Sequence, residues 1–254
     1  MRYESNDTPA IQLVQGALRV APMPLLMKMR RKIRPLLFLL LYAMMIYWNR
    51  RPRRTQIGIL ALRTDPAVFH PGQHFSSKLL AAYVANLDLN GCRVLDMGTG
   101  SGVIGVTAAL QGAQVVAVDI NIEAARLAAS NALDHGVSES MRVMCSDLFA
   151  ALAGTLEFDW IIFNPPFFPR AAEQASEIAF NAGNEYEVIQ RFLQQAKKFL
   201  APAGKILLIL SSDMDLARVQ SMLERRQFQI VRNEIKPHLF EIFHLVQLAV
   251  NSGQ

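Results

Sequence analysis

The sequence is poor in cysteine and histidine. Cys92 and Cys145 are the two cysteines among 254 residues, too few for the disulfide framework of a small secreted protein. Each adjoins or lies in a predicted strand, so we expect buried thiols in a reducing compartment and no redox role. Of the five histidines, His70 and His74 stand four apart on either side of a Pro-Gly turn, without a third ligand nearby. We therefore expect no metal site.

The motifs of several enzyme classes are also missing. The chain has no Walker loop, no Gly-x-Ser-x-Gly and no Cys-x-x-Cys. It also lacks Ser-Tyr-x-x-x-Lys, a set that could assist hydride transfer. The apolar run Leu36–Trp48 is thirteen residues long, shorter than the about 20 residues that a transmembrane helix needs. Nucleotide hydrolysis through a P-loop, serine hydrolysis and thiol exchange are therefore not indicated by any motif.

Charge is distributed unevenly, although the net charge is only +5. Residues 1–54 hold eleven Lys and Arg against two acids, whereas residues 55–254 hold fifteen against nineteen. The larger part is therefore slightly acidic, while a nucleic-acid enzyme usually carries basic residues near its site. If the protein bound RNA or DNA, the basic N-terminal arm would supply most of the attraction.

We divide the chain into a basic N-terminal extension, 1–54, and a larger domain, 55–254. Within the extension we expect an apolar helix over 36–48 with basic residues on both sides. A signal peptide is not expected, because this run begins far from Met1 and no small-residue cleavage site follows it. Three interpretations stay open: packing against the larger domain, contact of residues 28–54 with an anionic membrane surface, and a short membrane span.

The most informative stretch is Val94-Leu-Asp-Met-Gly-Thr-Gly-Ser-Gly102, where an apolar strand leads into alternating glycines. A helical pattern follows over 101–111. A buried strand, a glycine turn and the start of a helix form the first unit of a nucleotide-binding α/β sheet. Glycine allows the tight turn and lets a ligand lie on the backbone, and the helix N-terminus presents free N–H groups.

This loop by itself does not decide between two cofactors. Gly100–Gly105 also fits the G-x-G-x-x-G pattern of dinucleotide-binding enzymes, and Asp119 ends the next apolar run, nineteen residues beyond Gly100. A carboxylate there suits the ribose of a nicotinamide cofactor or of S-adenosylmethionine. The stretch Asp159–Phe167 favours the second cofactor, because another buried strand ends there in Asn-Pro-Pro-Phe.

In this order and spacing, the motifs resemble those of class I S-adenosylmethionine-dependent methyltransferases that methylate planar nitrogens. The closest resemblance, over about residues 65–250, is to the HemK-type, small-domain group, which includes release-factor glutamine methyltransferases and adenine or guanine N-methyltransferases. It implies that Asn164 Oδ1 and the Pro165 carbonyl accept from the acceptor nitrogen, and that Phe167 stacks on the planar group. The family often has Arg and Glu-Thr after its Val-Phe-x-Pro motif, where this chain has Gly72–Phe75.

The resemblance also implies a set of cofactor contacts. Asp96 would hold the loop and the methionine ammonium group, and Asp119 would accept from the ribose hydroxyls. Asp147 would accept from the adenine amino group, with Leu148 beside the ring. The expected contacts of S-adenosylmethionine are Asp96, Gly98, Thr99, Gly100, Gly102, Asp119, Ile120, Asp147, Leu148 and Asn164.

From Arg93 onward the periodicity predicts a regular alternation of strands and helices. Near-continuous apolar strands with helices between them indicate a parallel sheet covered on both faces, and the short link before the last strand predicts a hairpin. The expected fold is α/β and Rossmann-like: a seven-stranded, mostly parallel sheet with an antiparallel last strand. Strands are predicted at 57–62, 93–97, 115–119, 141–145, 159–163, 205–211, 227–232 and 241–248. Helices are predicted at 79–87, capped by Ser76 or Ser77, and at 101–111, 122–135, 184–200 and 213–226, the last capped by Asp213.

We predict an S-adenosylmethionine-dependent N-methyltransferase of the cytoplasm, with membrane-surface association as an open alternative. The acceptor stays open among protein glutamine, a nucleobase and a small-molecule amine, because residues 168–183 carry no readable code. Two other functions stay open: an NAD-dependent Rossmann oxidoreductase, and a non-catalytic S-adenosylmethionine-binding protein recruited to a membrane. The oligomeric state is not predicted.

Overall fold

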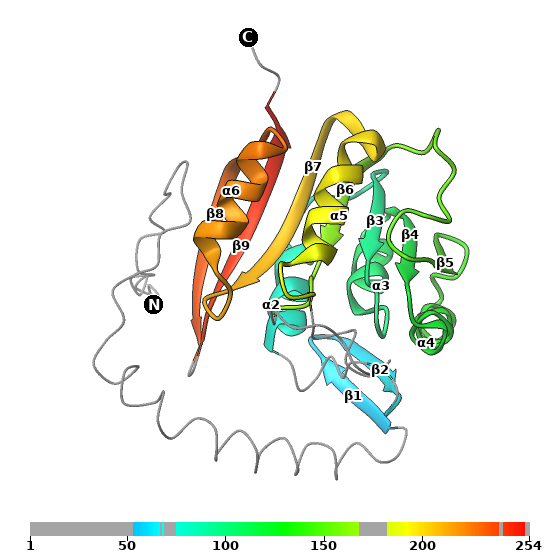
Figure 1. Cartoon of the computed structure of the whole chain (residues 1–254). Coiled ribbons are helices and arrows are strands. Elements are labelled where there is room, and N and C mark those ends of the chain that lie inside the picture. The colour runs from blue at the N-terminus through cyan, green and yellow to red at the C-terminus, as the bar shows by residue number, and fades with distance from the viewer. Residues whose placement is uncertain (1–52, 67, 69–74, 168–181, 239–240, 252–254) are drawn as a thin grey trace, which may run out of the picture.

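A twisted seven-stranded sheet organises the larger part of the chain (Figure 1). The computed structural model describes residues 53–66, 68, 75–167, 182–238 and 241–251. The strands are β1 (Arg53–Ile57), β2 (Leu60–Thr64), β3 (Arg93–Met97), β4 (Gln114–Asp119), β5 (Met141–Cys145), β6 (Phe158–Phe163), β7 (Leu200–Ser211), β8 (Phe228–His238) and β9 (Glu241–Val250). The helices are α2 (Phe75–Val84), α3 (Val103–Leu110), α4 (Ile122–Asp134), α5 (Glu187–Ala196), the 3-10 turn η2 (Lys197–Phe199) and α6 (Leu216–Arg225).

The strand order of the sheet is β5-β4-β3-β6-β7-β9-β8. The pairs from β5 to β7 are parallel, whereas β9 runs antiparallel to both of its neighbours. The predicted α/β, Rossmann-like fold with seven strands and an antiparallel last strand is confirmed. The predicted hairpin is also present, because the register of β8 and β9 pairs His238 with Glu241.

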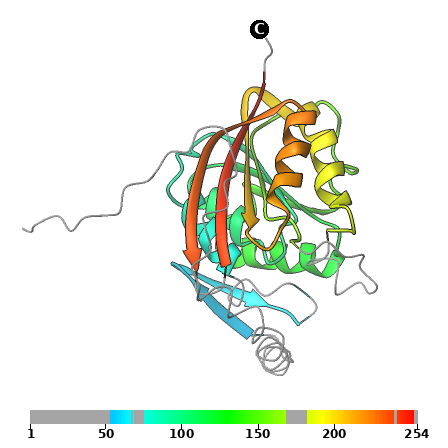
Figure 2. The same cartoon turned by 60° about the vertical axis from the view of Figure 1, so that its left-hand side comes forward.

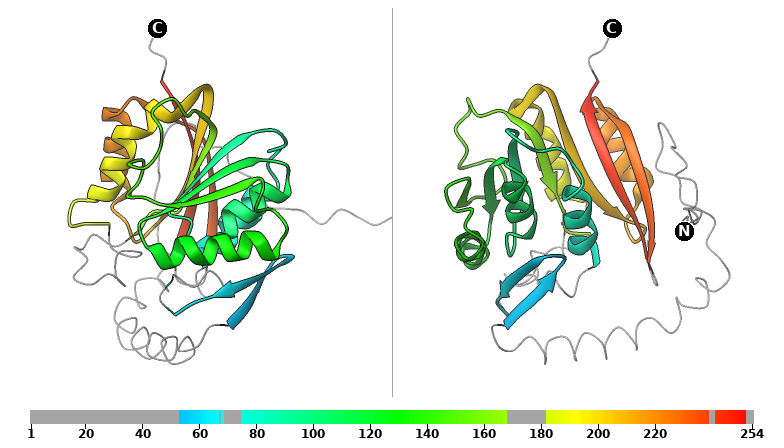
Figure 3. Two further views of the ribbon diagram at one scale, coloured as in Figure 1. Left: turned by 90° about the vertical axis from the view of Figure 1, so that its right-hand side faces the viewer. Right: turned by 180° about the vertical axis from the view of Figure 1, so that it is seen from behind.

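Helices cover both faces of the sheet, as Figure 3 (left) shows edge-on and Figure 2 shows from another side. Successive residues of a strand point to opposite faces. In β7, Leu208 packs with α5 and α6, while its neighbour Leu207 packs with α2 and α3. Apolar side chains on both faces therefore explain why the central strands read as unbroken apolar runs.

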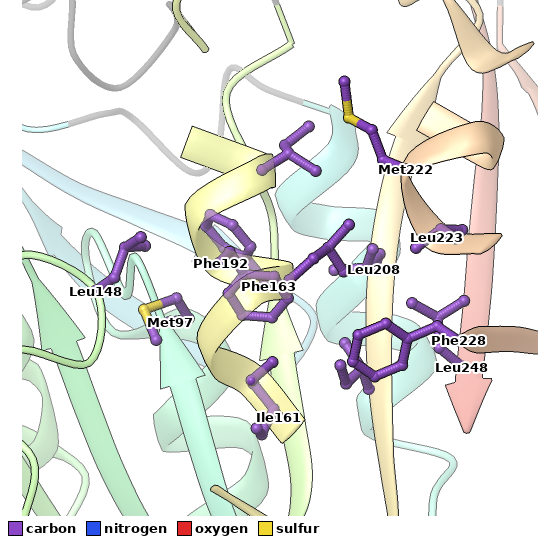
Figure 4. Packing of buried hydrophobic residues seen from close by; sticks show 14 of the residues in the cluster. Met97, Leu148, Ile161, Phe163, Phe192, Leu208, Met222, Leu223, Phe228 and Leu248 are labelled. Carbon is purple, nitrogen blue, oxygen red and sulfur yellow. The ribbon is translucent and has the colours of Figure 1, made fainter. Parts of the chain in front are cut away.

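Aromatic rings fill the core beneath α5. Phe192 is fully buried, and its ring centroid lies 4.7 Å from that of Phe163 in β6 and 5.6 Å from that of Phe149 (Figure 4). Phe149 belongs to the segment between β5 and β6, where no helix forms. That segment covers the same face through Leu148, Phe149 and Leu152.

The single strand predicted at 57–62 is wrong, because these residues belong to a hairpin. The chain turns at Gly58, whose φ of +56° suits glycine, and β1 pairs with β2 outside the main sheet. The hairpin is fastened to α4: Asn131 bonds the backbone of Arg63 at 2.8 and 3.1 Å, and Asp134 forms ion pairs with Arg54 and Arg63. The boundary expected at 54/55 falls within β1.

Several predicted boundaries also differ from the structure. Ser76 and Ser77 lie inside α2 and do not precede it, because the helix begins four residues earlier than predicted. α6 is capped by Asp215, whose side chain accepts from the Arg218 amide at 3.0 Å, and not by Asp213. β7 and β8 are longer than predicted, since ladder pairing carries polar residues along with apolar ones.

The N-terminal extension with its expected apolar helix at 36–48 lies outside the described residues. Within the ranges that the structure describes, no helix has the length and apolar character needed to cross a membrane.

Replacing Phe192 with alanine should lower the free energy of unfolding by about 3–5 kcal/mol, because it empties a large site between packed rings. Urea unfolding followed by circular dichroism measures this change. As a control, Leu133→Ala on α4 removes a side chain that is 69% exposed and should cost at most about 0.5 kcal/mol. Equal losses in the two variants would contradict the assigned core.

Candidate active site

The candidate site lies where the strand order reverses direction. β4 lies on one side of β3 and β6 on the other, so the connections after β3 and β6 leave the sheet on opposite sides. In open α/β sheets, ligands bind beyond the carboxyl ends of the strands at such a switch point. In Figure 1 the arrowheads of β3 and β4 point toward the end where the β1–β2 hairpin lies. Asp96 lies one residue before the end of β3, Asp119 is the last residue of β4, and Asn164 directly follows β6.

The glycine loop after β3 turns through left-handed backbone conformations. Gly98, Gly100 and Gly102 have φ values of +65°, +56° and +84°. At Gly102, an added Cβ would lie 3.0 Å from the Cα of Ala128 in α4, so glycine is needed for the close approach of the loop and this helix. At Gly100, an added Cβ would meet open space. Gly102 therefore serves packing, while Gly100 leaves its surface free for a ligand.

Asp96 holds the two ends of this loop together. It is 2% exposed, and its Oδ2 accepts from Thr99 Oγ1 at 2.6 Å and from the Gly105 amide of α3 at 2.9 Å. Burial raises the pKa of Asp96 to about 6, although these two hydrogen bonds lower it, and the neighbouring charge of Asp119 raises it further. The carboxyl is thus a loop anchor whose ionisation is moved to a higher pH than is usual for aspartate.

Asp119 connects the end of β4 to the same loop. Its Oδ2 accepts from the Gly100 amide at 2.8 Å and its Oδ1 from the Asn121 amide at 2.9 Å. Burial raises the pKa of Asp119, while the backbone hydrogen bonds from Asn121, Gly100 and Ile120 lower it. The next residue, Ile120, is 47% exposed, which leaves an apolar side chain at the rim of the site.

Asp147 has a partner that the sequence did not reveal. Arg191 of α5 donates from Nη2 to its Oδ2 at 2.6 Å, and both side chains are about half exposed. The adjacent Leu148 is buried with φ of +50°, and its carbonyl accepts from Ser146 Oγ at 2.8 Å. Asp147 therefore lies in an ion pair and is not part of the network that joins Asp96, Asp119 and the glycine loop.

The end of β6 brings Asn164 against α2. Asn164 Nδ2 donates to Ser77 Oγ at 3.3 Å and to Ser76 Oγ at 3.4 Å. Pro165 is buried and follows directly. The half-buried ring of Phe167 lies 6.2 Å from that of Phe243 in β9, centroid to centroid. Ser76 and Ser77, predicted as helix caps, are thus contacts of the predicted catalytic residue.

Asn131 also contacts the site, although the sequence predicted no more for it than a place in the helix at 122–135. It is fully buried, and its Nδ2 donates at 2.8 Å to the carbonyl of Ser101 in the glycine loop. The same side chain bonds β2, so it joins the hairpin to the loop. The one sequence signal for this role was an asparagine among the apolar positions of the predicted helix, because an amide buried there needs hydrogen-bond partners.

The donors and acceptors at the switch point fit S-adenosylmethionine. The ribose hydroxyls and the methionine ammonium group need acceptors, which Asp119 and Asp96 can supply. The methionine carboxylate needs donors, which the N-terminus of α3 can supply. The buried hydroxyl of Ser101 has no hydrogen-bond partner among the described residues, so the loop holds an unused polar group beside this helix end. Residues 69–74, which include most of the Val-Phe-x-Pro motif, and residues 168–181 lie outside the described residues.

Comparison with known proteins gives a consistent match. The family model "Methyltransferase small domain" matches residues 60–244. A relative from Methanocaldococcus jannaschii, provisionally named a protein N(5)-glutamine methyltransferase, is 33% identical over 163 residues, which are 62% of this chain and 79% of the relative. The release factor glutamine methyltransferase of Gloeobacter violaceus is 29% identical over 185 residues, covering 68% of this chain and 64% of that protein.

Other curated relatives are longer, and the chain spans 24 to 43% of their length. Among solved structures, the ribosomal protein L11 methylase of Lactobacillus delbrueckii subsp. bulgaricus superimposes with a TM-score of 0.54 at 22% identity. This superposition covers 73% of this chain and 83% of the other. At this identity the likeness supports the fold alone.

The raised pKa of Asp96 predicts how stability depends on pH when Asp96 is replaced by asparagine. The folded chain holds this proton more tightly than the unfolded chain, so its stabilising effect is complete below pH about 4 and is lost as the pH rises through about 6. Asparagine has no such proton to lose. Between pH 4 and 8 the stability of Asp96→Asn relative to the ligand-free parent should rise by about 1 to 3 kcal/mol. Urea unfolding of both proteins at pH 4, 6 and 8 measures this change. A difference in unfolding free energy that does not vary with pH would contradict the burial of Asp96.

Proposed function

The chain belongs to the methyltransferase small domain family, and from this premise we propose that it methylates the side-chain amide nitrogen of a glutamine in a protein acceptor. The observation that carries the proposal is the placement of Asn164 at the switch point. Its amide nitrogen bonds α2, which leaves Oδ1 available to an acceptor group. Pro165 and Phe167 follow it as the motif requires.

The family makes S-adenosylmethionine the cofactor and methyl transfer the class of reaction. The predicted S-adenosylmethionine-dependent N-methyltransferase is confirmed at this level. The alternative of an NAD-dependent oxidoreductase is not favoured, although its glycine pattern is present in the loop.

S-adenosylmethionine, when bound, supplies a sulfonium-activated methyl group. The protein then has to hold the acceptor nitrogen in line, with the reacting atoms about 3 Å apart, and make its lone pair available. An amide lone pair is delocalised into the carbonyl group and is a poor nucleophile. Asn164 Oδ1 and the Pro165 carbonyl would accept from the two N–H groups and favour the pyramidal form of the nitrogen. The proline rings fix the backbone that carries this carbonyl.

For the cofactor we assign roles to the strand-end acids. Asp119 would accept from the ribose hydroxyls, and its amide partners Gly100 and Asn121 keep the carboxylate turned toward the loop. Asp96 would hold the methionine ammonium group, whose positive charge would favour the ionised carboxyl. Asp147, Leu148 and Ile120 would meet the adenine. Gly98, Thr99 and Gly102 would shape the loop beneath the cofactor.

Two observations support a protein acceptor. The names of the relatives from M. jannaschii and G. violaceus both specify glutamine, one in proteins and the other in release factors. In addition, residues 55–254 carry four more acids than basic residues, which disfavours contact with a polyanion at the site. Both cysteines are free, but Cys92 is only partly buried and Cys145 is exposed, so the predicted burial of both thiols is wrong. Free thiols agree with a reducing compartment, and we place the reaction in the cytoplasm. Membrane contact through residues 28–54 stays a prediction.

A matched pair of glycine variants tests the cofactor loop. Gly100 and Gly136 both have positive φ and open space around an added Cβ, but Gly136 follows α4 away from the switch point. Alanine at either position should cost about 1–2 kcal/mol of stability, because the backbone strain is similar. Only Gly100→Ala should also weaken S-adenosylhomocysteine binding, by at least about tenfold in calorimetry. Equal binding of S-adenosylhomocysteine by the two variants would contradict the assignment of this loop to the cofactor site.

Asn164→Ala tests the catalytic assignment. The variant should lose transfer by about 100- to 1000-fold, the range seen when one preorganised polar contact to the reacting group is removed. Its affinity for S-adenosylhomocysteine should stay within about twofold. Asn86→Ala, which replaces an exposed asparagine just beyond the far end of α2, is the matched control and should keep full activity.

The assay uses methyl-labelled S-adenosylmethionine with the full chain and a fractionated cell extract. Label that protease removes, and that complete enzymatic digestion to amino acids returns as methylated glutamine, is the expected result. Label that nuclease removes would show that the acceptor is a nucleic acid and not a protein. Label in the small-molecule or lipid fraction would show an acceptor of that class. Cofactor binding without any transfer would leave the non-catalytic alternative standing.

A further inference from the structure

The role proposed for Asn164 demands one orientation of its side-chain amide. Oδ1 can accept from an acceptor N–H group, whereas Nδ2 in the same place would set a donor against a donor. The χ2 torsion of asparagine is broad and roughly two-fold, so torsional preference does not choose between the two orientations. Neighbouring groups must therefore make the choice.

The first turn of α2 offers two hydroxyl groups to one end of this amide. Ser76 Oγ and Ser77 Oγ lie 3.4 and 3.3 Å from Asn164 Nδ2, and the two serines are only 3% and 5% exposed. A serine in a helix commonly donates its own hydrogen to a backbone carbonyl of the preceding turn, so each hydroxyl keeps lone pairs that can accept one of the two amide hydrogens. Oδ1 is then turned away from α2. No other described side chain bonds Asn164.

The turn that carries these serines is itself fixed to the Asn-Pro-Pro-Phe segment. Phe75 is the first residue of α2, and its ring centroid lies 5.7 Å from that of Phe243. The ring centroid of Phe243 lies 6.2 Å from that of Phe167. On its other side, Phe75 stacks on His238 of β8 at 3.9 Å. Aromatic packing thus holds α2 and the segment after β6 in one arrangement, which keeps both hydroxyls beside the amide.

Helix stability and packing do not explain two buried serines at this place. Alanine is the better helix former and would occupy nearly the same volume. A buried hydroxyl is costly unless it is hydrogen-bonded. Among the described residues, Asn164 is the partner that bonds both hydroxyls.

We propose that Ser76 and Ser77 are positioning residues that clamp the Asn164 amide with Oδ1 toward the methyl acceptor. The inference rests on the proposed function of Asn164. It adds α2 to the elements that build the acceptor side of the site. The serines touch neither cofactor nor acceptor in this role and act through Asn164.

The kinetic test compares Ser76→Ala, Ser77→Ala and the double variant in the full chain. Each single change should lower kcat about tenfold, equivalent to about 1.4 kcal/mol, with the KM for S-adenosylmethionine unchanged. Ser77→Thr, which keeps the hydroxyl, should retain more activity than Ser77→Ala. Ser221→Ala, a serine on the outer side of α6, is the matched control and should be fully active.

Repeating the alanine changes in an Asn164→Asp background separates positioning from structure. A carboxylate has two equivalent acceptor oxygens, so its orientation needs no clamp. The serine replacements should then cost less than about twofold. A loss as large as in the parent background would mean that the serines act structurally, and the proposal would be overturned.

Nuclear magnetic resonance observes the clamp without relying on activity. The side-chain NH₂ signals of Asn164, assigned by their loss in Asn164→Ala, should exchange slowly in the parent. In the double alanine variant they should exchange faster and move toward free-amide shifts, while Ser221→Ala leaves them in place. Unchanged signals together with unchanged kcat would overturn the clamp. If the parent methylates no acceptor at all, the proposed function fails, and the amide signals still decide whether the serines hold Asn164.

Discussion

The site depends first on one buried carboxyl group, that of Asp96. Its Oδ2 accepts from both the Thr99 hydroxyl and the Gly105 amide of α3, which ties the glycine turn to the helix that follows it. Burial makes that acceptor costly to ionise, as the pKa of about 6 reflects. The loop is therefore built around a group that a bound cation would stabilise, which suits a cofactor with an ammonium group and a sulfonium centre.

Around this anchor, three separate tethers bring distant segments to the same edge of the sheet. Asp119 bonds Gly100 and so joins β4 to the loop. Asn131 bonds Ser101 and Arg63, which joins α4 and the β1–β2 hairpin to the loop. Asn164 bonds α2 through two serines. Each tether uses a buried or half-buried polar side chain, so each is specific in geometry and sensitive to replacement. The first two tethers end in the glycine loop after β3, and the third starts just beyond β6, which pairs with β3 in the sheet.

Much of the fold could be predicted from the sequence, because its signals are local. Apolar runs bounded by glycine and acids located β3 to β6 within one residue, and the short link before β9 required an antiparallel hairpin. Boundaries failed where the local pattern was ambiguous. The serines of α2 looked like caps, but a buried turn extended the helix past them. The 57–62 run looked like one strand, but Gly58 with its positive φ turned it into a hairpin.

Chain order and residue type were enough to predict the class of fold, the order of the strand-end residues and the family resemblance. Which polar groups become partners depended on how the elements pack. Ser77 and Asn164 are 87 residues apart, and Arg191 reaches Asp147 across 44 residues. Spacing in the sequence does not predict such pairs, because the packing of helices on a twisted sheet sets the distance between the two residues of each pair. The order of the motif residues could be read from the chain, whereas the contact between Asn164 and α2 forms only when that helix packs against the end of β6.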